Sequence, residues 1–594
     1  MTAISRRQLL AGSSALAVTL NGILHSAPGF AATPFRLPEL PPMPDLAPAR
    51  PEESVDMADP SEWAETKLSF PIADGPFGSS WPEIEKAYPD KGTEWLREAK
   101  FGIWVHFGPQ AAGNSGDWYA KYMYDPTGRW GNKAYDNHVR NFGHPSEVGY
   151  KDILKDWNPT NLHPDTLVDL YKKAGAKFLL VQGVHHDNYD NWDSKYQKWN
   201  SVNIGPKRDL LGEWVTAARQ AGLKYGVTFH HEYTWWWWQT AFGADTTGPK
   251  AGVPYDGHLT EADGKGTWWE GLDPRMLYTV NLREYRGLDT RWAPARGIFQ
   301  NHEKYAEWYA TWWAYRIMDV IENYDPDFIY TDGDSQNPYT GEKSGTGAKN
   351  DAASRVIAHY YNRTKARRNT VDTFSVIKFK KPTKGLVTTE EGGFPEGIKR
   401  EQPWIGEVPI GDWFYGPGFI YEASSVIRYV LETASRDGAS AVCIPMRPDG
   451  SLDPECLSLL SEVGEWMALN GEGIYGSSAW RVLGEGEMID GKLKVARKGA
   501  LGVRQHSVSF DQRDFRFTQG RDGAVYAFCL VVPEAGTRLT IRSLADDGTD
   551  KVKSVHLLGR DRQPKWKHTS DGLTIEVPRN HGHSITMSFR IVTT

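Results

Sequence analysis

The stretch Asp325-Pro-Asp-Phe-Ile-Tyr-Thr-Asp-Gly-Asp334 decides the fold, because its apolar run ends in the carboxylate of Asp332 beside a glycine turn. The segment 302–323, just before it, has an amphipathic helical pattern. A helix followed by a short strand that finishes in a polar residue is typical of a parallel α/β sheet. The stretch therefore predicts a strand over 328–332 with Asp332 at its carboxyl end.

The same alternation of short apolar runs and amphipathic stretches extends from about residue 90 to 465. Strands are predicted at 101–107, 178–182, 225–230, 328–332, 373–377 and 440–445. Helices are predicted at 163–174, 208–220 and 302–323. Repeated strand-then-helix units indicate an α/β fold, a (β/α)8-like TIM barrel. In such barrels the catalytic groups lie at the carboxyl ends of the strands.

From about residue 475 the pattern changes to short alternating runs separated by Gly and Asp turns. These runs are 501–510, 523–532, 538–543 and 573–577. They predict an antiparallel β-sandwich appended to the barrel. The chain of 594 residues divides into a signal peptide (1–32), an arm (33–89), the barrel (90–470) and the sandwich (471–594).

The amino terminus is typical of a twin-arginine export signal. Arg6 and Arg7 precede a mild apolar run over 11–24, and Gly29-Phe-Ala31 offers small residues for cleavage after Ala31. The run is shorter than the roughly 20 residues that a membrane-spanning helix needs. We therefore expect a periplasmic or secreted protein without a membrane partner.

Composition narrows the classes of partner. The formal net charge is −7 and no long run of Lys and Arg occurs, which argues against nucleic-acid binding. The 25 Trp residues favour a carbohydrate, because indole faces stack on sugar rings, although large cores also use Trp. Three cysteines cannot form a disulfide framework, and no Cys/His spacing indicates zinc. No cofactor is predicted.

Two carboxylate-bearing strand ends suggest glycoside hydrolysis. Asp332 ends one apolar run, and the run from Leu386 ends in Glu390 and Glu391. Hydrolysis of a glycosidic bond needs two such carboxyls, one to attack and one to protonate the leaving oxygen. His185 and His186, with His230, His231 and Glu232, could instead hold a metal. Adjacent strand residues point to opposite faces, however, so no metal is predicted.

At these residues the chain resembles the α-L-fucosidases of glycoside hydrolase family 29 over about 90–480. The most specific stretch is His185-His-Asp187, followed by Asn191-Trp-Asp-Ser-Lys195, Trp199-Asn-Ser-Val-Asn203 and Gly205-Pro-Lys-Arg-Asp209. The segments 101–108, 327–333, 435–438 with 445–450, and 470–475 are similar to other family motifs in the same order.

The resemblance implies a role for each matching residue. Asp332 would be the nucleophile and Glu390 the acid/base, with Glu391 and Glu407 as reserves. The fucose pocket would be lined by His106, Asp117, Trp118, His185, His186, Tyr330 and Trp413. The family more often has Glu at the position of Asp117, and a pocket arginine common in the family has no clear counterpart near 371–374. The run Trp235–Trp238 could form an aromatic wall or pack the rim of the barrel.

The resemblance thus implies a retaining exo-α-L-fucosidase acting on fucosylated oligosaccharides or polysaccharides. Three alternatives stay open at this point. They are a related α-L-glycosidase taking L-galactosides or fucans, a non-catalytic sugar-binding protein on the same fold, and a metal-dependent hydrolase built on the histidine pairs. The sequence makes no prediction of the oligomeric state.

Overall fold

The computed structural model describes most of the chain between residues 35 and 594. The described segments are 35–45, 65–128, 133–232, 234–281, 303–333, 349–378, 383–418, 420–486, 509–546, 548, 551–560 and 563–594. The predicted signal peptide at 1–32 and most of the predicted strand at 501–510 lie outside these segments.

An eight-stranded parallel sheet forms the centre of the larger part of the molecule. Its strands in spatial order are β7 (Phe374–Ile377), β5 (Phe328–Thr331), β4 (Lys224–Phe229), β3 (Phe178–Val184), β2 (Phe101–Val105), β10 (Ala439–Cys443), β9 (Trp404–Pro409) and β8 (Thr388–Glu391). A parallel bridge between Ser375 and Leu386 links the two edges, so the sheet is a nearly closed barrel. The predicted TIM-barrel class is confirmed.

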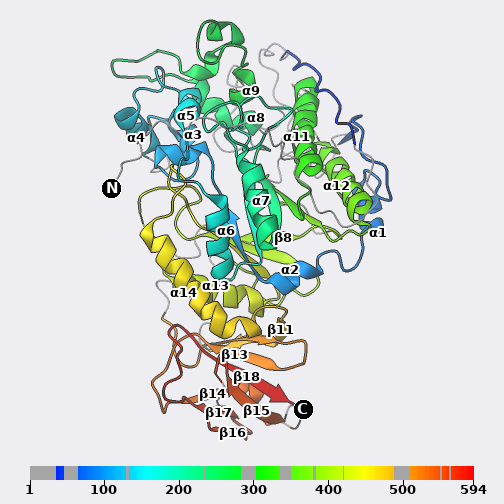
Figure 1. Cartoon of the computed structure of the whole chain (residues 1–594), viewed down its shortest axis with the longest axis vertical. Helices are drawn as coiled ribbons and strands as arrows, with labels where there is room; N and C mark the ends of the chain where they lie inside the picture. Colours follow the sequence, from blue (N-terminus) through cyan, green and yellow to red (C-terminus); the bar gives the residue numbers. More distant parts are fainter. Residues whose placement is uncertain are drawn as a thin grey trace, which may run out of the picture.

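Helices surround this barrel (Figure 1). They are α1 (Trp81–Ala87), α2 (Glu94–Ala99), α3 (Tyr119–Tyr122), α4 (Ala134–Asn141), α5 (Tyr150–Asp156), α6 (Pro164–Lys173), α7 (Leu210–Ala221), α8 (Thr234–Trp237), α9 (Arg275–Tyr278), α11 (Glu303–Tyr324), α12 (Ala352–Arg368), α13 (Ala423–Ser435) and α14 (Pro454–Asn470). Local signals set their ends: in α7 the Asp209 carboxylate accepts from Gly212 N–H, and Gly222 terminates the helix at φ 70°. Within the described residues, none of these helices has the length and apolar composition to cross a membrane.

Side chains that alternate along the barrel strands fill the interior. The inner layers include Trp104, Phe178, Leu180, Phe328, Tyr330, Phe374, Val376, Ile405, Ala441 and Cys443. Because successive strand residues face opposite sides, the next inward position on several strands lies two residues further along. Those positions are His106, Asp332, Lys378 and Glu407. The apolar core thus gives way to polar chemistry at the carboxyl end of the barrel.

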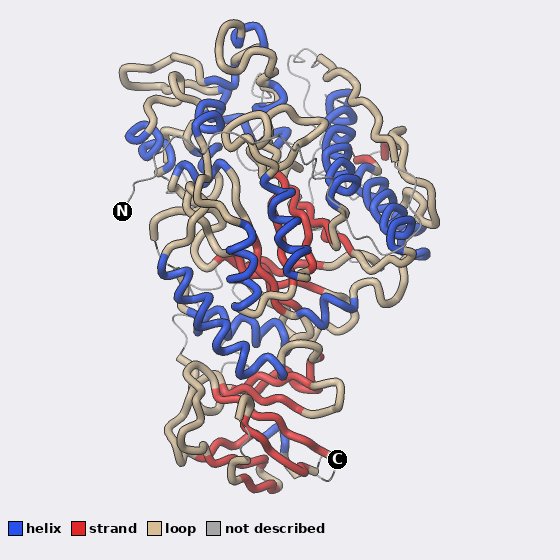
Figure 2. Tube along the Cα trace, viewed as in Figure 1, coloured by secondary structure: helices blue, strands red, loops and turns tan. Residues whose placement is uncertain are grey.

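The carboxyl-terminal part consists of two antiparallel sheets, seen at the bottom of Figure 2. One has the order β11 (Ser478–Glu485), β12 (Phe515–Gln519), β13 (Val525–Cys529), β18 (Met587–Thr593) and β15 (Val552–Leu557); the other is β14 (Arg538–Ile541), β17 (Gly572–Glu576) and β16 (Trp566–Thr569). A separate apolar cluster packs between them. These sheets match the predicted sandwich, and β13, β14 and β17 lie within or across its predicted strands.

Buried charges join the sandwich to the barrel. Glu432 on α13 accepts from Arg516 on β12 at 2.5 Å and also pairs with Arg436. The Glu432 and Arg516 side chains are fully buried.

The amino-terminal arm 35–45 lies against α11, where Trp308 Nε1 donates to the Pro41 carbonyl at 2.7 Å. Two short parallel strands, β1 (Glu65–Thr66) and β6 (Lys349–Asn350), add a further connection.

Candidate active site

A cavity of about 400 Å³ opens at the carboxyl end of the barrel. It is lined by Trp104, His106, Asp117, Trp118, Tyr122, His185, His186, His230, Tyr330, Asp332, Lys378, Glu391, Glu407 and Trp413. Every predicted site residue except Glu390 contributes to this lining. The sequence motifs therefore converge on one site, to which the structure adds Trp104, Tyr122, His230 and Lys378.

Asp332 follows β5, and three cationic or hydrogen-bonding side chains surround its carboxylate. Its Oδ2 is 3.0 Å from His230 Nδ1 and 3.7 Å from His186 Nε2, and its Oδ1 is 3.0 Å from Lys378 Nζ. Burial alone would raise the pKa of Asp332, but Lys378 and the hydrogen bond from His230 outweigh it and hold that pKa below its usual range. Asp332 is thus an ionised carboxylate inside the cavity, which is the state that a nucleophile requires.

Lys378, which sequence reasoning missed, is the cationic centre of the site. It follows β7, and its ammonium lies 3.0 Å from Asp332 Oδ1, 2.9 Å from Glu391 Oε2 and 3.6 Å from Glu407 Oε1. Its side chain is only 11% exposed. Desolvation lowers the pKa of Lys378, yet the surrounding acids, Asp332 first among them, raise it well above the usual value. The ammonium therefore keeps its charge.

Glu407 on β9 is the most deeply placed carboxyl of the site, with its side chain 1% exposed. Its Oε1 accepts a hydrogen bond from Tyr330 Oη at 3.1 Å. Burial, reinforced by the nearby Glu391 and Asp332 and opposed by Lys378, raises the pKa of Glu407 to about 8. At neutral pH Glu407 is consequently mostly a neutral carboxylic acid.

Glu390, the predicted acid/base, is not among the residues that line the cavity. Its Oε1 is 3.6 Å from Lys399 Nζ. Glu391, the next residue of β8, lines the cavity and is in register with Glu407 of β9. Neighbouring residues of a strand face opposite sides, so only one of Glu390 and Glu391 can point into the barrel. That residue is Glu391.

The histidines present hydrogen-bonding nitrogens to the cavity. His185 Nδ1 is 2.5 Å from Gln110 Nε2, and His186 Nδ1 donates to the His230 carbonyl at 2.5 Å. Burial lowers the pKa of His185 well below its usual value and that of His186 to about 3. Burial likewise lowers the pKa of His106. Neutral imidazoles at these positions can bind sugar hydroxyls without adding positive charge.

The loop that carries the histidine pair is anchored by α11. Arg316 forms a buried ion pair with Asp190, and its Nη1 donates to Asn188 Oδ1 at 2.5 Å. Trp192 Nε1 donates to Asp319 Oδ2 at 2.9 Å on the same helix. This buried network holds the loop at the end of β3, which explains why its motif combines Asp, Asn and Trp.

Aromatic rings form the remaining walls. The ring centroids of Trp104 lie 4.9 Å from Tyr330 and 5.1 Å from Trp413, and Trp118 is 5.4 Å from His186. Asp117 Oδ1 is 3.8 Å from His185 Nε2, and burial raises the pKa of Asp117 well above its usual value. The cavity wall thus combines imidazoles with aromatic rings, a surface that can meet both the hydroxyls and the apolar edge of a sugar.

The run Trp235–Trp238 packs the rim of the barrel at the three positions whose burial is described. Trp235, Trp237 and Trp238 are each at most 1% exposed. Trp237 lies 5.8 Å from Trp118 and Trp238 lies 5.0 Å from Tyr278, centroid to centroid. Trp237 therefore supports the wall of the cavity from behind.

Two groups of described side chains bring metal-ligand types together, His185 with His186 and His230, and His106 with Asp117 and His185. Their donor atoms lie within 4.8 Å of one another. Ligands at about 2 Å from one tetrahedral ion would lie about 3.3 Å apart. His186 Nδ1 and His230 Nδ1 are already engaged with a carbonyl and with Asp332. A metal could therefore reach these two rings only through their Nε2 atoms.

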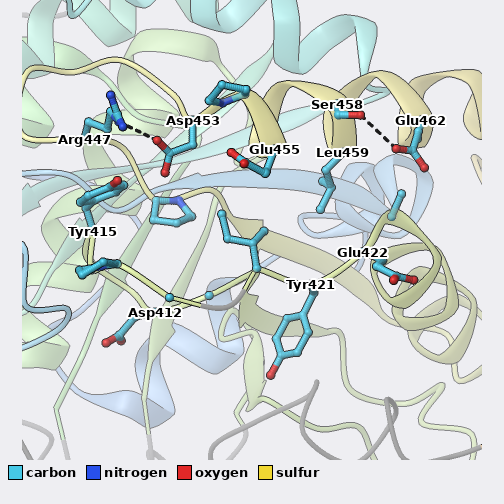
Figure 3. Close-up of a pocket in the computed structure, with 18 of the residues that line it drawn as sticks. Asp412, Tyr415, Tyr421, Glu422, Arg447, Asp453, Glu455, Ser458, Leu459 and Glu462 are labelled. Atoms are coloured by element: carbon cyan, nitrogen blue, oxygen red, sulfur yellow. Dashed lines mark hydrogen bonds and ion pairs between the residues drawn. The ribbon is translucent and has the colours of Figure 1, made fainter.

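A second and larger cavity, of about 910 Å³, is lined in part by residues of the segment 411–418 (Figure 3). Gly116 N–H donates to the Tyr415 carbonyl at 3.1 Å, and Asp117 N–H donates to Asp412 Oδ2 at 3.2 Å, so this segment is shared by the walls of both cavities. Five acidic residues contribute to the lining of the second cavity, Asp412, Glu422, Asp453, Glu455 and Glu462. The carboxylates on the ends of the barrel strands lie in the smaller one.

Two carboxyl groups in contrasting electrostatic surroundings at the carboxyl end of a (β/α)8 barrel are the arrangement that glycoside hydrolysis requires. The profile described as Alpha-L-fucosidase matches residues 69–472, and that described as Alpha-L-fucosidase C-terminal domain matches residues 510–592. The chain belongs to the α-L-fucosidase family and is a glycoside hydrolase.

Individual relatives agree with this assignment. The chain is 24% identical to the tissue alpha-L-fucosidase of Bos taurus over 533 residues, covering 84% of this chain and 86% of that protein. For the tissue alpha-L-fucosidase of Homo sapiens the identity is 24% over 508 residues, with coverage of 84% and 87%. Among solved structures, the Thermotoga maritima alpha-fucosidase in complex with fucose superposes with a TM-score of 0.61 at 19% identity, covering 87% of this chain and all (100%) of that one. An alpha-L-fucosidase from Bacteroides thetaiotaomicron, trapped as a covalent intermediate, gives a TM-score of 0.55 at 15% identity, with coverage of 89% and 100%.

Proposed function

We propose that this fucosidase releases terminal α-L-fucosyl residues with retention of configuration, using Asp332 as the nucleophile and Glu391 as the acid/base. One observation carries the proposal: Asp332 Oδ1 and Glu391 Oε2 lie 3.0 and 2.9 Å from the same ammonium of Lys378. The two oxygens are therefore at most about 6 Å apart, compatible with the separation of about 5–5.5 Å that a retaining glycosidase needs.

Exposure favours Glu391 over Glu407 as the acid/base. The Glu391 side chain is 38% exposed and that of Glu407 is 1% exposed. In an exo-acting enzyme the aglycone leaves through the mouth of the cavity, so the group that protonates the leaving oxygen must reach that mouth. Glu407 lies below it, bound to Tyr330.

The proposed reaction is a double displacement. An Asp332 oxygen forms a bond to C1 while the C1–O bond to the aglycone breaks, and the Glu391 proton moves to the departing oxygen. Glu391, now a carboxylate, then removes a proton from water as the water oxygen attacks C1 and the Asp332 ester breaks. Asp332 regains its negative charge and Glu391 its proton. His106, His185 and His186 would bind the fucose hydroxyls, while Tyr330 and Trp413 would pack against the apolar edge with its methyl group.

The shape of the cavity supports exo action on a fucosylated glycan. Its volume of about 400 Å³ and its floor of packed barrel residues suit one terminal sugar rather than an internal position of a chain. The partner is accordingly the non-reducing end of an oligosaccharide or polysaccharide.

Product stereochemistry tests the mechanism. Proton NMR of early time points should show α-L-fucose first, followed by slow mutarotation; β-L-fucose as the first product would refute retention. Azide tests the acid/base assignment: Glu391→Ala should be rescued by azide to give the α-fucosyl azide, because azide displaces the enzyme ester in place of water. Rescue confined to Glu407→Ala would move the role to Glu407.

We also propose export through the twin-arginine route, on the basis of Arg6 and Arg7 ahead of the apolar run 11–24. Replacing both arginines by lysine should retain the protein in the cytoplasm, whereas the unaltered chain should be recovered from the periplasm or medium. Equal periplasmic yields of both proteins would contradict this route.

A further inference from the structure

The position of Lys378 has a consequence for the movement of charge during the reaction. The ammonium nitrogen is nearly equidistant from the two carboxyls to which the proposed function gives the chemical steps, at 3.0 Å from Asp332 and 2.9 Å from Glu391. The side chains of Lys378 and Asp332 are 11% and 13% exposed and that of Glu391 is 38% exposed, so water screens the contact with Asp332 the less. One fixed cation therefore contacts both carboxyl groups that take part in the proposed reaction.

During the proposed reaction a negative charge moves between Asp332 and Glu391. Before the first displacement Asp332 is negative and Glu391 carries the proton. After it, Asp332 is a neutral ester and Glu391 is negative, since its proton has left with the aglycone oxygen. The second displacement reverses both changes. The site thus carries the same total charge throughout, while a single negative charge moves from one side of Lys378 to the other and back.

We propose that Lys378 is an electrostatic positioning residue that stabilises whichever of the two carboxyls is negative, so that proton transfer from Glu391 is coupled to formation of the Asp332 ester. This inference rests on the proposed roles of Asp332 and Glu391. Nothing in the family assignment gives a role to a lysine at this place.

The contact between Lys378 and Glu391 explains how the cation can lower the barrier to the reaction. A cation that bound Asp332 alone would stabilise the nucleophile in the ground state and slow its attack, because stabilisation that is lost in the transition state raises the barrier. Since Lys378 also contacts Glu391, the attraction given up at Asp332 is recovered at Glu391 as that group becomes ionised. The preorganised ammonium needs no movement for this exchange.

Glu407, the third carboxyl near the Lys378 ammonium, does not disturb the stabilisation of Asp332 and Glu391. Glu407 Oε1 is 3.6 Å from Lys378 Nζ, further than either catalytic oxygen, and it accepts a hydrogen bond from Tyr330. The raised pKa of Glu407 keeps it mostly neutral near pH 7. A neutral Glu407 does not compete for the cation, so the charge of Lys378 stays available to Asp332 and Glu391.

Leaving-group dependence tests this role, because kcat/KM reports the first displacement. We would measure kcat/KM for a series of aryl α-L-fucosides with phenols of increasing pKa, using wild type, Lys378→Met, Lys378→Gln and Lys378→Arg. For the neutral variants we expect a loss of roughly 100-fold on poor leaving groups and about 10-fold on activated ones. The plot against leaving-group pKa should therefore steepen, whereas Lys378→Arg should keep the wild-type slope.

The pH profile gives an independent readout. Removing the ammonium raises the pKa of Asp332, so the acid limb of kcat/KM should move to higher pH in both neutral variants. Lys399→Met is the matched control, since Lys399 pairs with Glu390 outside the cavity at 3.6 Å and should change neither slope nor limb.

Each outcome has a defined meaning. A uniform loss with unchanged slope and unchanged acid limb in a folded Lys378→Gln protein would overturn the proposal and leave Lys378 a merely structural role. Should Lys378→Met fail to fold, Lys378→Gln and Lys378→Arg still decide the slope. Failure of the wild type to release fucose from any substrate would instead refute the proposed function itself.

Discussion

Replacing Glu407 by glutamine should stabilise the protein at pH 8 and have little effect on stability at pH 4.5. Glu407 is buried, and its pKa is raised from 4.5 to about 8. Glutamine has nearly the shape of the protonated acid and cannot ionise. The variant therefore keeps the hydrogen-bonded contact with Tyr330 but loses the cost of burying a charge.

The size of the effect follows from linkage between proton binding and folding. Between the unfolded and folded pKa values the folded chain holds a proton that the unfolded chain has released, so the free energy of unfolding falls as pH rises. Each pH unit in that window costs about 1.4 kcal/mol. From pH 4.5 to 8 the loss amounts to about 4–5 kcal/mol in the wild type, and Glu407→Gln should not show it.

Chemical denaturation monitored by tryptophan fluorescence at pH 4.5, 6 and 8 measures this difference. The stability gain of Glu407→Gln over wild type should be near zero at pH 4.5 and grow steadily to pH 8. Glu390→Gln, which removes a partly exposed carboxyl outside the cavity, is the control and should show no such growth. A gain that is equal at all three pH values, or a loss at pH 8, would refute the reasoning.

Three further predictions concern the site and its support. Glu391→Gln should lower kcat/KM on an unactivated fucoside by about 100- to 10,000-fold, while Glu390→Gln stays within a few-fold of wild type. Kinetic measurements on both variants check this prediction, and a larger loss in Glu390→Gln would return the acid/base role to Glu390. Glu432→Gln should reduce the free energy of unfolding by about 3–5 kcal/mol, because it leaves buried Arg516 and Arg436 without a counter-charge; urea denaturation measures it, and no loss would show that water or rearrangement compensates. Prolonged treatment with a strong chelator should leave activity unchanged, whereas a loss restored by added zinc would support the metal hypothesis based on the histidines.

Most of the barrel could be predicted because its strands are short apolar runs between helical patterns. The predicted strands at 101–107, 178–182 and 328–332 agree with β2, β3 and β5 to within one or two residues. The end of β8 was recognised from the apolar residues Leu386 and Val387 before it, whereas β9 was not identified. β8 reads Thr-Thr-Glu-Glu, and β9 contains Gly406, Glu407 and Pro409, so neither shows the apolar pattern from which buried strands are recognised.

The same polar strands explain why the sequence led to Glu390 rather than Glu391. Residues at the ends of β2, β3 and β5 were found because apolar runs fixed their direction. Within β8 no apolar residue marks the inward face, and the two residues before it, Leu386 and Val387, are both apolar, so the sequence pattern did not distinguish Glu390 from Glu391. The register with β9, which pairs Glu391 with Glu407, supplies that information only in three dimensions.

Lys378 was missed for a related reason. It precedes Phe379-Lys-Lys381, and within that basic stretch a lysine resembles part of a solvated turn. A usable signal was present two residues earlier: Val376 points into the barrel, so the same face continues to Lys378. The family resemblance directed attention to an arginine near 371–374 instead, where the strand has only just begun.

The most direct test of the account is hydrolysis of a chromogenic α-L-fucoside by the mature chain, compared with Asp332→Gly. The account predicts release of the chromophore by the wild type, loss of nearly all activity in the variant at unchanged folding, and rescue of the variant by azide with formation of β-fucosyl azide. Azide then takes the place of the Asp332 carboxylate in a single inversion. Near wild-type activity in Asp332→Gly, or an inactive variant that azide restores with α-fucosyl azide as its product, would contradict Asp332 as the nucleophile.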